Sequence, residues 1–303
     1  MTMKRAKADQ KRKSGLKKPT FFDVINVLLQ VLLGFCFLYP IWYCIICSIS
    51  SADALKTGLP LLWPKGATLQ AYAYILKSAD IFRYYLNTIF YALGGTLISL
   101  VLTAMMAYPF TVEEFKGKKL LNLLMVIPMF IGGGLLPTYY LISGMGLRNT
   151  VWVMLLPGAV TGYNMIVFRT FFKSIPASLR EAAYIDGAGH YRVLVTIMAP
   201  LSAALLATFG LFGIVGRWND WFTPFLYLTR DSLKPMQLYL RTVLVAISSK
   251  TQQEGDVLLT MNQVVEQNIK CATILITILP ILCVYPFLQK YFAKGVMVGA
   301  VKS

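Results

Sequence analysis

The sequence predicts an all-α integral membrane protein with about six transmembrane helices, from its composition and from the length of its apolar stretches. Of the 303 residues, 57% are hydrophobic and only 14% are charged, and the mean hydropathy is +0.62. A soluble globular protein has about 25% charged residues, so this composition excludes one. A spanning helix needs roughly 20 apolar residues, and stretches of that length occupy residues 24–50, 84–110, 120–143, 151–172, 194–222 and 271–292.

Residues 1–20 form a strongly basic arm ahead of the first apolar stretch. The arm contains eight Lys and Arg residues and a single acid, Asp9. The positive-inside rule retains such a segment in the cytoplasm, and six crossings bring the C-terminus back to the same side. We therefore expect both termini, residues 111–119 and residues 173–193 to be cytoplasmic. The stretch 24–50 is too long for a signal-peptide core and lacks a small-residue cleavage site, so we expect an uncleaved anchor.

The net charge of +16 raises the question of a nucleic-acid partner. The basic arm supplies much of this excess, and it has neither interleaved aromatic residues nor a base-reading motif. A cytoplasmic arm of this kind is attracted to anionic lipid headgroups. We therefore expect contact with membrane lipid and no nucleic-acid binding.

Glycine and proline interrupt the predicted spans, most strongly the third to the fifth. Three glycines are consecutive at 132–134, and the prolines in or beside spans are Pro40, Pro109, Pro128, Pro137, Pro157, Pro200, Pro280 and Pro286. Irregular backbone at membrane depth is tolerated only where protein or a water-filled cavity satisfies its polar groups. The breaks fit either a transport pathway or simple kinks for helix packing, and the sequence leaves both open.

Reactive and metal-binding residues are scarce in this sequence. The five cysteines lie in the first and last spans, where they form no disulfide framework and no zinc spacing. His190 is the only histidine, so we expect no histidine-built metal site and no catalytic residue. The spans hold no cluster of acids, which argues against a membrane enzyme. They also lack a mid-span carboxylate, which argues against an ion-coupled secondary transporter.

Residues 173–193 predict a bent helical hairpin between two apolar stretches. Pro176 suits the first position of a helix, where its missing N–H is not needed. The helix is expected over residues 177–186, and Gly187 can adopt the left-handed conformation that ends it. A second short helix is expected from about His190, leading to a span whose beginning Pro200 marks. By spacing alone, the segment is either a docking element for another protein or an amphipathic helix at the membrane surface.

The first helix of the hairpin combines small and large side chains. The small ones would let a partner approach closely and the large ones would supply contact area; they are Ala182, Ala183 and Ala188, and Leu179, Tyr184 and Ile185. Glu181 either lies at such a contact or caps the hairpin's own backbone, and the sequence does not decide between these roles.

Residues 223–270 form the longest segment outside the predicted spans, on the extracellular side. The segment is too short for a core of its own, so we expect a loop with ordered pieces. Residues 249–256 are expected at its exposed tip, and residues 257–267 are expected to form a short helix. Contact with an extracellular partner and a simple tether between two spans are both open.

The region from residue 181 to residue 200 resembles the cytoplasmic signature of permease subunits of bacterial binding-protein-dependent ABC importers. The positions in register are Glu181, Ala182, Ala183, Gly187, Ile197 and Pro200. Ala199 departs from the pattern, which has Leu before the proline. Because several fixed spacings agree in a membrane context, this match is far more specific than a lone short motif.

Shorter matches extend over nearly the whole chain after the basic arm and resemble the carbohydrate-uptake branch, the maltose-permease type. They are Asn87-Thr88, residues 146–150 (G-L-R-N-T), residues 218–221 (W-N-D-W) and residues 289–295. Residues 235–241 and 295–302 are similar to a subgroup that handles larger or acidic oligosaccharides, including alginate importers. Together these matches favour a sugar over a non-sugar solute, which stays the alternative.

The resemblance implies a type I ABC importer permease fold for residues 21–303, located in the bacterial cytoplasmic membrane. It implies a translocation pathway for a sugar or oligosaccharide, with an acidic one such as alginate among the candidates. The implied partners are a second permease subunit, usually a different chain, two cytoplasmic ATPase subunits and an extracellular solute-binding protein. ATP and Mg would bind to the ATPase subunits, and no cofactor to this chain, which has no G-x-x-x-x-G-K-[ST] loop.

The resemblance also implies roles for particular residues. The hairpin would be the segment that couples the permease to the ATPase, here Glu181, Ala182, Ala183, Tyr184, Ile185, Asp186, Gly187 and Ala188. A sugar pathway needs aromatic faces and hydrogen-bonding groups, which are available close to helix breaks at Tyr139, Tyr140, Tyr163, Asn164, Trp218 and Asn219. For Trp218 and its neighbours, anchoring at the membrane surface is the favoured interpretation.

Two arginines bear on the charge of the substrate. Arg217 and Asp220 lie near a span end, where they can reach the membrane surface or pair with each other. An acidic sugar would give Arg169 or Arg217 a role.

Overall fold

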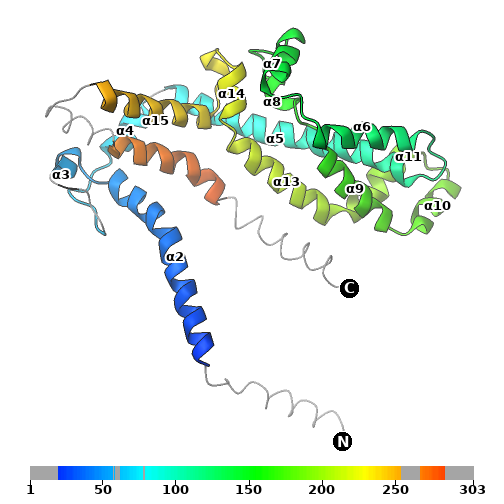
Figure 1. Ribbon diagram of the computed structural model, residues 1–303, viewed down its shortest axis with the longest axis horizontal. Coiled ribbons are helices and arrows are strands. Elements are labelled where there is room, and N and C mark those ends of the chain that lie inside the picture. The colour runs from blue at the N-terminus through cyan, green and yellow to red at the C-terminus, as the bar shows by residue number, and fades with distance from the viewer. Residues whose placement is uncertain (1–19, 57, 59–61, 78, 254–266, 284–303) are drawn as a thin grey trace, which may run out of the picture.

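The chain is built from helices joined by short connections (Figure 1). The computed structural model describes residues 20–283 apart from 57, 59–61, 78 and 254–266, and this part of the chain contains no strand. The all-α prediction is therefore confirmed for these residues. The basic arm up to residue 19, most of the helix predicted at 257–267, and the end of the last predicted span lie outside them.

Helix α2 (Phe21–Ser48) confirms the first predicted span. Thr20 caps its start: the Thr20 N–H donates to Asp23 Oδ2 over 2.8 Å, and the Asp23 N–H donates to Thr20 Oγ1. The helix extends away from the rest of the molecule, and its buried residues are all in its last turn (Figure 1). There Cys47 packs with Leu55 and Cys271. An apolar helix that its own chain leaves uncovered requires lipid or another subunit around it.

Helix α5 (Ala79–Ala107) continues into the 3₁₀ turn η1 (Tyr108–Thr111). Together they form the longest continuous helical segment in the described part of the chain. Helix α13 (Ala203–Trp218) packs along it (Figure 1). Small residues line the contact: a Cβ atom at Gly213 would lie 2.8 Å from Thr96, and one at Gly95 would lie 2.6 Å from Arg217 Cζ. Glycines at a helix contact let two backbones approach closely within a membrane.

The third and fourth predicted spans are broken in the structure. Helix α6 (Lys118–Phe130) and α7 (Leu135–Gly144) are separated by a non-helical segment that contains the three consecutive glycines. Helix α8 (Trp152–Leu155) and α9 (Gly162–Ser174) are separated by residues 156–161, which contain Pro157 and Gly158. The interruptions that the sequence predicts in these two spans are therefore present, because glycine and proline interrupt the helical hydrogen-bond ladder.

The fifth predicted span is bent. The chain passes through α11 (His190–Val193), the π-turn η2 (Leu194–Met198) and α12 (Ala199–Leu201), and then turns by 82° into α13. The turn is at Ser202, whose N–H donates to both Met198 O and Ala199 O. Among the described residues, two helices are long and apolar enough to span a membrane, Phe21–Ser48 and Asp80–Thr111, and the number is three if this bent pair is one span. A total of six crossings stays a prediction.

The segment predicted as the loop 223–270 is more helical than expected. It contains α14 (Phe222–Tyr227), η3 (Asp231–Leu233) and α15 (Met236–Gln253), and α15 lies along α5 (Figure 1). Asn87 Nδ2 donates to Ser232 O and Lys234 O, and Thr88 Oγ1 accepts from the Met236 N–H. The Asn-Thr pair of α5 therefore anchors this segment. A further helix, Gln267–Cys283, follows.

The contact between α5 and α13 can be tested with two alanine substitutions. Gly213→Ala is expected to destabilise the protein by about 1–3 kcal/mol, because the added Cβ overpacks against Thr96. Gly216→Ala is the matched control, since a Cβ there meets nothing within 4 Å. Thermal melting of the purified protein in detergent measures the difference. Equal melting temperatures for the two variants would contradict this packing.

Candidate functional site

The predicted hairpin is present in the structure. Helix α10 (Ala177–Ile185) starts directly after Pro176 and ends in a left-handed turn at Gly187, whose φ is +79°. The Gly187 N–H donates to Tyr184 O over 3.0 Å, and the Ala188 N–H donates to Ala183 O over 2.9 Å. This pair of bonds is a Schellman motif, which satisfies the last carbonyls of the helix. Helix α11 then begins at His190, as the sequence predicted.

Side-chain hydrogen bonds fasten the hairpin to the end of α5. The Tyr184 and Tyr108 hydroxyls are 2.7 Å apart, and the Tyr184 hydroxyl is also 2.9 Å from His190 Nδ1. Arg180 Nη1 donates to Thr111 O over 2.9 Å. Because Tyr108 and Thr111 belong to η1, the hairpin is held directly by the end of the long helical segment Asp80–Thr111. The sequence analysis missed these anchors, since the partners are about 70 residues apart.

The two sides of α10 have different surroundings. Ala183 is buried in a core with Phe172, Val193 and other residues, so it supports the hairpin from within. Tyr184 is half-buried and packs against the same core. Ile185 is 86% exposed, and Glu181, Ala182 and Asp186 are exposed as well. No residue that the structure describes donates a hydrogen bond to the Glu181 carboxylate, which therefore does not cap the hairpin there.

The tyrosine anchor is testable by removing one hydroxyl. Tyr184→Phe is expected to cost about 1–3 kcal/mol of stability, because the buried Tyr108 hydroxyl loses its partner. Amide exchange over residues 177–188 should then accelerate. Tyr191→Phe is the control, because Tyr191 lies in α11 and is 72% exposed, so the loss of its hydroxyl leaves no buried group without a partner. An unchanged exchange rate in the Tyr184 variant would show that the hydroxyls do not hold the hairpin.

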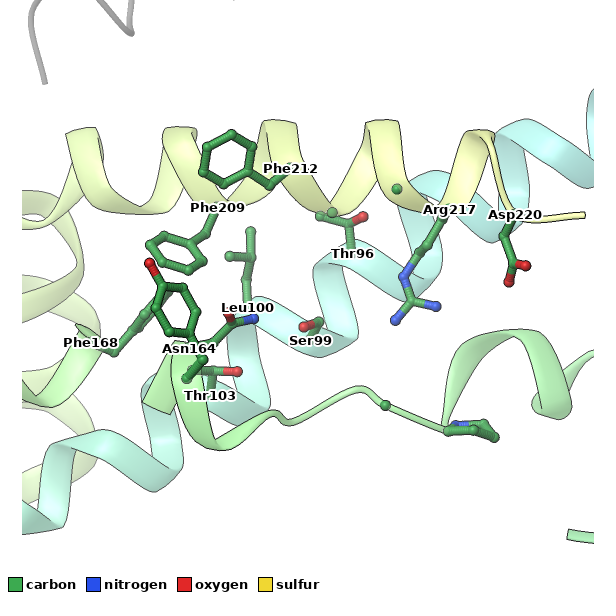
Figure 2. A pocket seen from close by; sticks show the side chains of 15 residues that line it. Thr96, Ser99, Leu100, Thr103, Asn164, Phe168, Phe209, Phe212, Arg217 and Asp220 are labelled. Carbon is green, nitrogen blue, oxygen red and sulfur yellow. The ribbon is translucent and has the colours of Figure 1, made fainter. Parts of the chain in front are cut away.

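A cavity of about 510 Å³ lies between α5, α9, α13 and the break at residues 156–161 (Figure 2). Its wall on α5 is polar, with Thr96, Ser99 and Thr103 on one side of the helix. Aromatic residues cover one end, and Arg217 and Asp220 are at the other (Figure 2); the aromatic lining consists of Tyr163, Phe168, Phe209 and Phe212. The break between α8 and α9 thus borders a cavity, as irregular backbone within a membrane protein requires.

Only two of the six residues proposed for a substrate pathway line this cavity, Tyr163 and Asn164. The others lie elsewhere. Tyr139 stacks on Tyr227 with ring centroids 5.6 Å apart, and Tyr140 is exposed beside it. Trp218 is buried and its Nε1 donates to Thr277 O in the last described helix, whereas Asn219 Oδ1 accepts from Gln237 Nε2. Trp218 therefore packs helices together instead of anchoring at a membrane surface.

The charged residues near this cavity do not pair with one another. Arg217 Nη1 donates to Met154 O over 2.8 Å, and Asp220 Oδ1 accepts from the N–H groups of Phe222 and Thr223 at the start of α14. Arg169, the other arginine considered from the sequence, is outside the cavity and donates to Asn122 Oδ1. Within the described part of the chain, no group of three or more His, Cys, Asp and Glu side chains is arranged to bind a metal.

Comparison with known proteins agrees with this architecture. Residues 94–298 match the sequence family described as "Binding-protein-dependent transport system inner membrane component". The chain belongs to this family. It is 40% identical to protein LplC of Bacillus subtilis over 284 residues, which cover 93% of this chain and 95% of LplC. It is 33% identical to the B. subtilis polygalacturonan/rhamnogalacturonan transport system permease protein YtcP over 286 residues, covering 94% and 100% of the two chains.

A solved structure shares the fold as well. It is a chain of a bacterial ABC transporter involved in the import of the acidic polysaccharide alginate. The two chains superimpose with a TM-score of 0.80 at 30% sequence identity, over 89% of this chain and 96% of the other. The protein is therefore a membrane permease with the type I ABC importer fold, and the hairpin lies in the region that the family shares.

Proposed function

We propose that this chain is one of two transmembrane subunits of an ATP-driven importer and forms part of the pathway for an oligosaccharide. A cavity with a polar wall and aromatic cover, in a permease fold, is the observation that carries the proposal. Sugars present both hydroxyl groups and apolar C–H faces, so hydroxyl, amide and aromatic side chains suit them. The relative named for polygalacturonan/rhamnogalacturonan transport and the alginate importer support this substrate class.

We propose that the hairpin couples the permease to a cytoplasmic ATPase subunit, which would carry ATP and Mg. Ile185 and Tyr191 are large apolar side chains exposed on a protruding polar segment. Exposed apolar groups of this kind fit a groove on a partner protein. The complete assembly would contain a second permease subunit, two ATPase subunits and an extracellular solute-binding protein, in the bacterial cytoplasmic membrane. The positive-inside rule supports a cytoplasmic position for the hairpin, where an ATPase subunit could reach it.

Purification and transport together test the proposed function. A tagged chain taken from its native membrane should bring an ATPase subunit and a second permease with it. Proteoliposomes containing this complex and its solute-binding protein should accumulate an oligosaccharide only when ATP is supplied. Uptake that follows an ion gradient, in a preparation free of any ATPase subunit, would refute the proposal and favour a secondary transporter.

The turn at Gly187 gives a sharper test of coupling. Gly187→Val is expected to lower uptake about tenfold while ATP hydrolysis continues, because a β-branched residue at φ +79° is strained by about 1–3 kcal/mol and reshapes the hairpin. Gly189→Thr is the control. Thr has nearly the shape of Val, so the two variants add side chains of similar size. Gly189 has an ordinary φ of −73° and precedes α11, a position where Thr is favourable. Parental uptake by the Gly187 variant would count against a coupling role.

A further inference from the structure

We propose that Arg217 forms an anion-binding subsite in the cavity, which receives the carboxylate of an acidic sugar residue. This inference rests on the proposed function, in that the cavity is taken as part of a saccharide pathway, and it names the chemical class of the saccharide. Four features carry it: the position of the guanidinium group, its lack of a salt bridge, two unsatisfied hydroxyls along the α5 wall of the cavity, and the aromatic lining at the other end.

The guanidinium group of Arg217 is fixed at one end of the cavity (Figure 2). It packs directly over Gly95, where any side chain would displace it, and its Nη1 donates to Met154 O over 2.8 Å. These two contacts hold the guanidinium group in place. Only one of its N–H donors is used, and the acceptor is an uncharged backbone carbonyl. A guanidinium group has five N–H donors in a planar fork that matches a carboxylate. The remaining donors are therefore available to a ligand in the cavity.

Arg217 forms no salt bridge with another residue in the described part of the chain. Asp220 lines the same cavity and attracts the guanidinium group of Arg217 electrostatically, but the two form no salt bridge, and one Asp220 oxygen caps the first N–H groups of α14. A charge removed from water is costly unless another charge compensates it. Arg217 is half-buried and Asp220 compensates its charge only at a distance, so an anionic ligand would complete the compensation, whereas a neutral sugar would not.

Two hydroxyl groups in the cavity wall also lack partners. Thr96 is 4% exposed and Thr103 is 1% exposed, and neither Oγ1 atom has a hydrogen-bond partner in the structure. Both residues line the cavity from α5, on the same side of the helix as Ser99 (Figure 2). Buried hydroxyls without partners are uncommon in native proteins. A saccharide whose carboxylate binds Arg217 would extend along these hydroxyls toward the aromatic end of the cavity.

Transport of a uronic acid oligomer tests the subsite. The reconstituted complex, with its solute-binding protein saturated by a trimer of galacturonate, is compared for the parental chain, Arg217→Gln, Arg217→Lys and Arg169→Gln. Loss of a hydrogen bond to a charged group predicts at least about a tenfold fall in uptake for Arg217→Gln. Arg217→Lys should recover part of the rate, because it keeps the charge but not the planar fork. Arg169→Gln, which removes an arginine outside the cavity, should stay within about twofold of the parent.

A second measurement reports the charge of the cavity without any substrate. In the complex with the native cysteines of this chain replaced, Ser99→Cys provides a thiol in the cavity wall. The rate of its modification by an anionic methanethiosulfonate, divided by the rate for a cationic one, should fall about tenfold when Arg217→Gln is added. An Arg169→Gln addition should leave the ratio unchanged.

The outcomes separate the two levels of the proposal. If the parental complex takes up no saccharide with ATP while the thiol ratio still depends on Arg217, the proposed function fails and the anion subsite stands. If uptake is ATP-driven but Arg217→Gln transports galacturonate at the parental rate, the subsite is refuted. A loss of uptake that Arg217→Lys does not recover, with an unchanged thiol ratio, would also refute it and assign Arg217 to packing alone.

Discussion

The close contact between α5 and α13 determines where every other functional feature lies. Glycines on both helices bring the two backbones together, so that Thr96 of α5 touches α13 and Arg217 of α13 lies over Gly95 of α5. The two helices then form two walls of the cavity, and α9 and the break before it form the rest. A larger residue in this contact would separate the walls and displace the guanidinium group at the same time. Small residues at the contact thus serve both packing and the geometry of the site.

The same helix connects the cavity to the hairpin. Helix α5 carries the cavity hydroxyls in its middle and continues into η1, which bonds to Tyr184 and Arg180 of α10. A single core joins η1, α9, the hairpin and the start of α13, with Phe168, Phe172, Met198 and Leu205 in it. Packed cores respond to a displaced element by moving as a body, since they are close-packed and not continuously deformable. A force applied to the hairpin would therefore reach the cavity walls through α5.

Local patterns in the sequence predicted some features well. The apolar stretches predicted α2 and α5, and the glycine at position 187 predicted the end of α10, because each depends on residues close together in the chain. The sequence also predicted that the third to fifth spans are interrupted, but it did not predict the residues at which each helix ends. Long-range partners had no local signal. The sequence favoured a surface anchor at Trp218, whereas the structure places its side chain against Thr277. Of the residues proposed for the substrate pathway, only Tyr163 and Asn164 line the cavity.

The central claim is that the hairpin and the cavity wall formed by α5 move as one body. The most direct measurement is the distance between spin labels at Ser178 of α10 and Leu97 of α5, both exposed, in the assembled transporter with and without bound nucleotide. The account predicts that the mean distance changes by less than about 2 Å, the scale of small shifts within packed helices. A change of roughly 5 Å or more, about one helical turn, would show that the hairpin moves independently of α5 and would contradict the account.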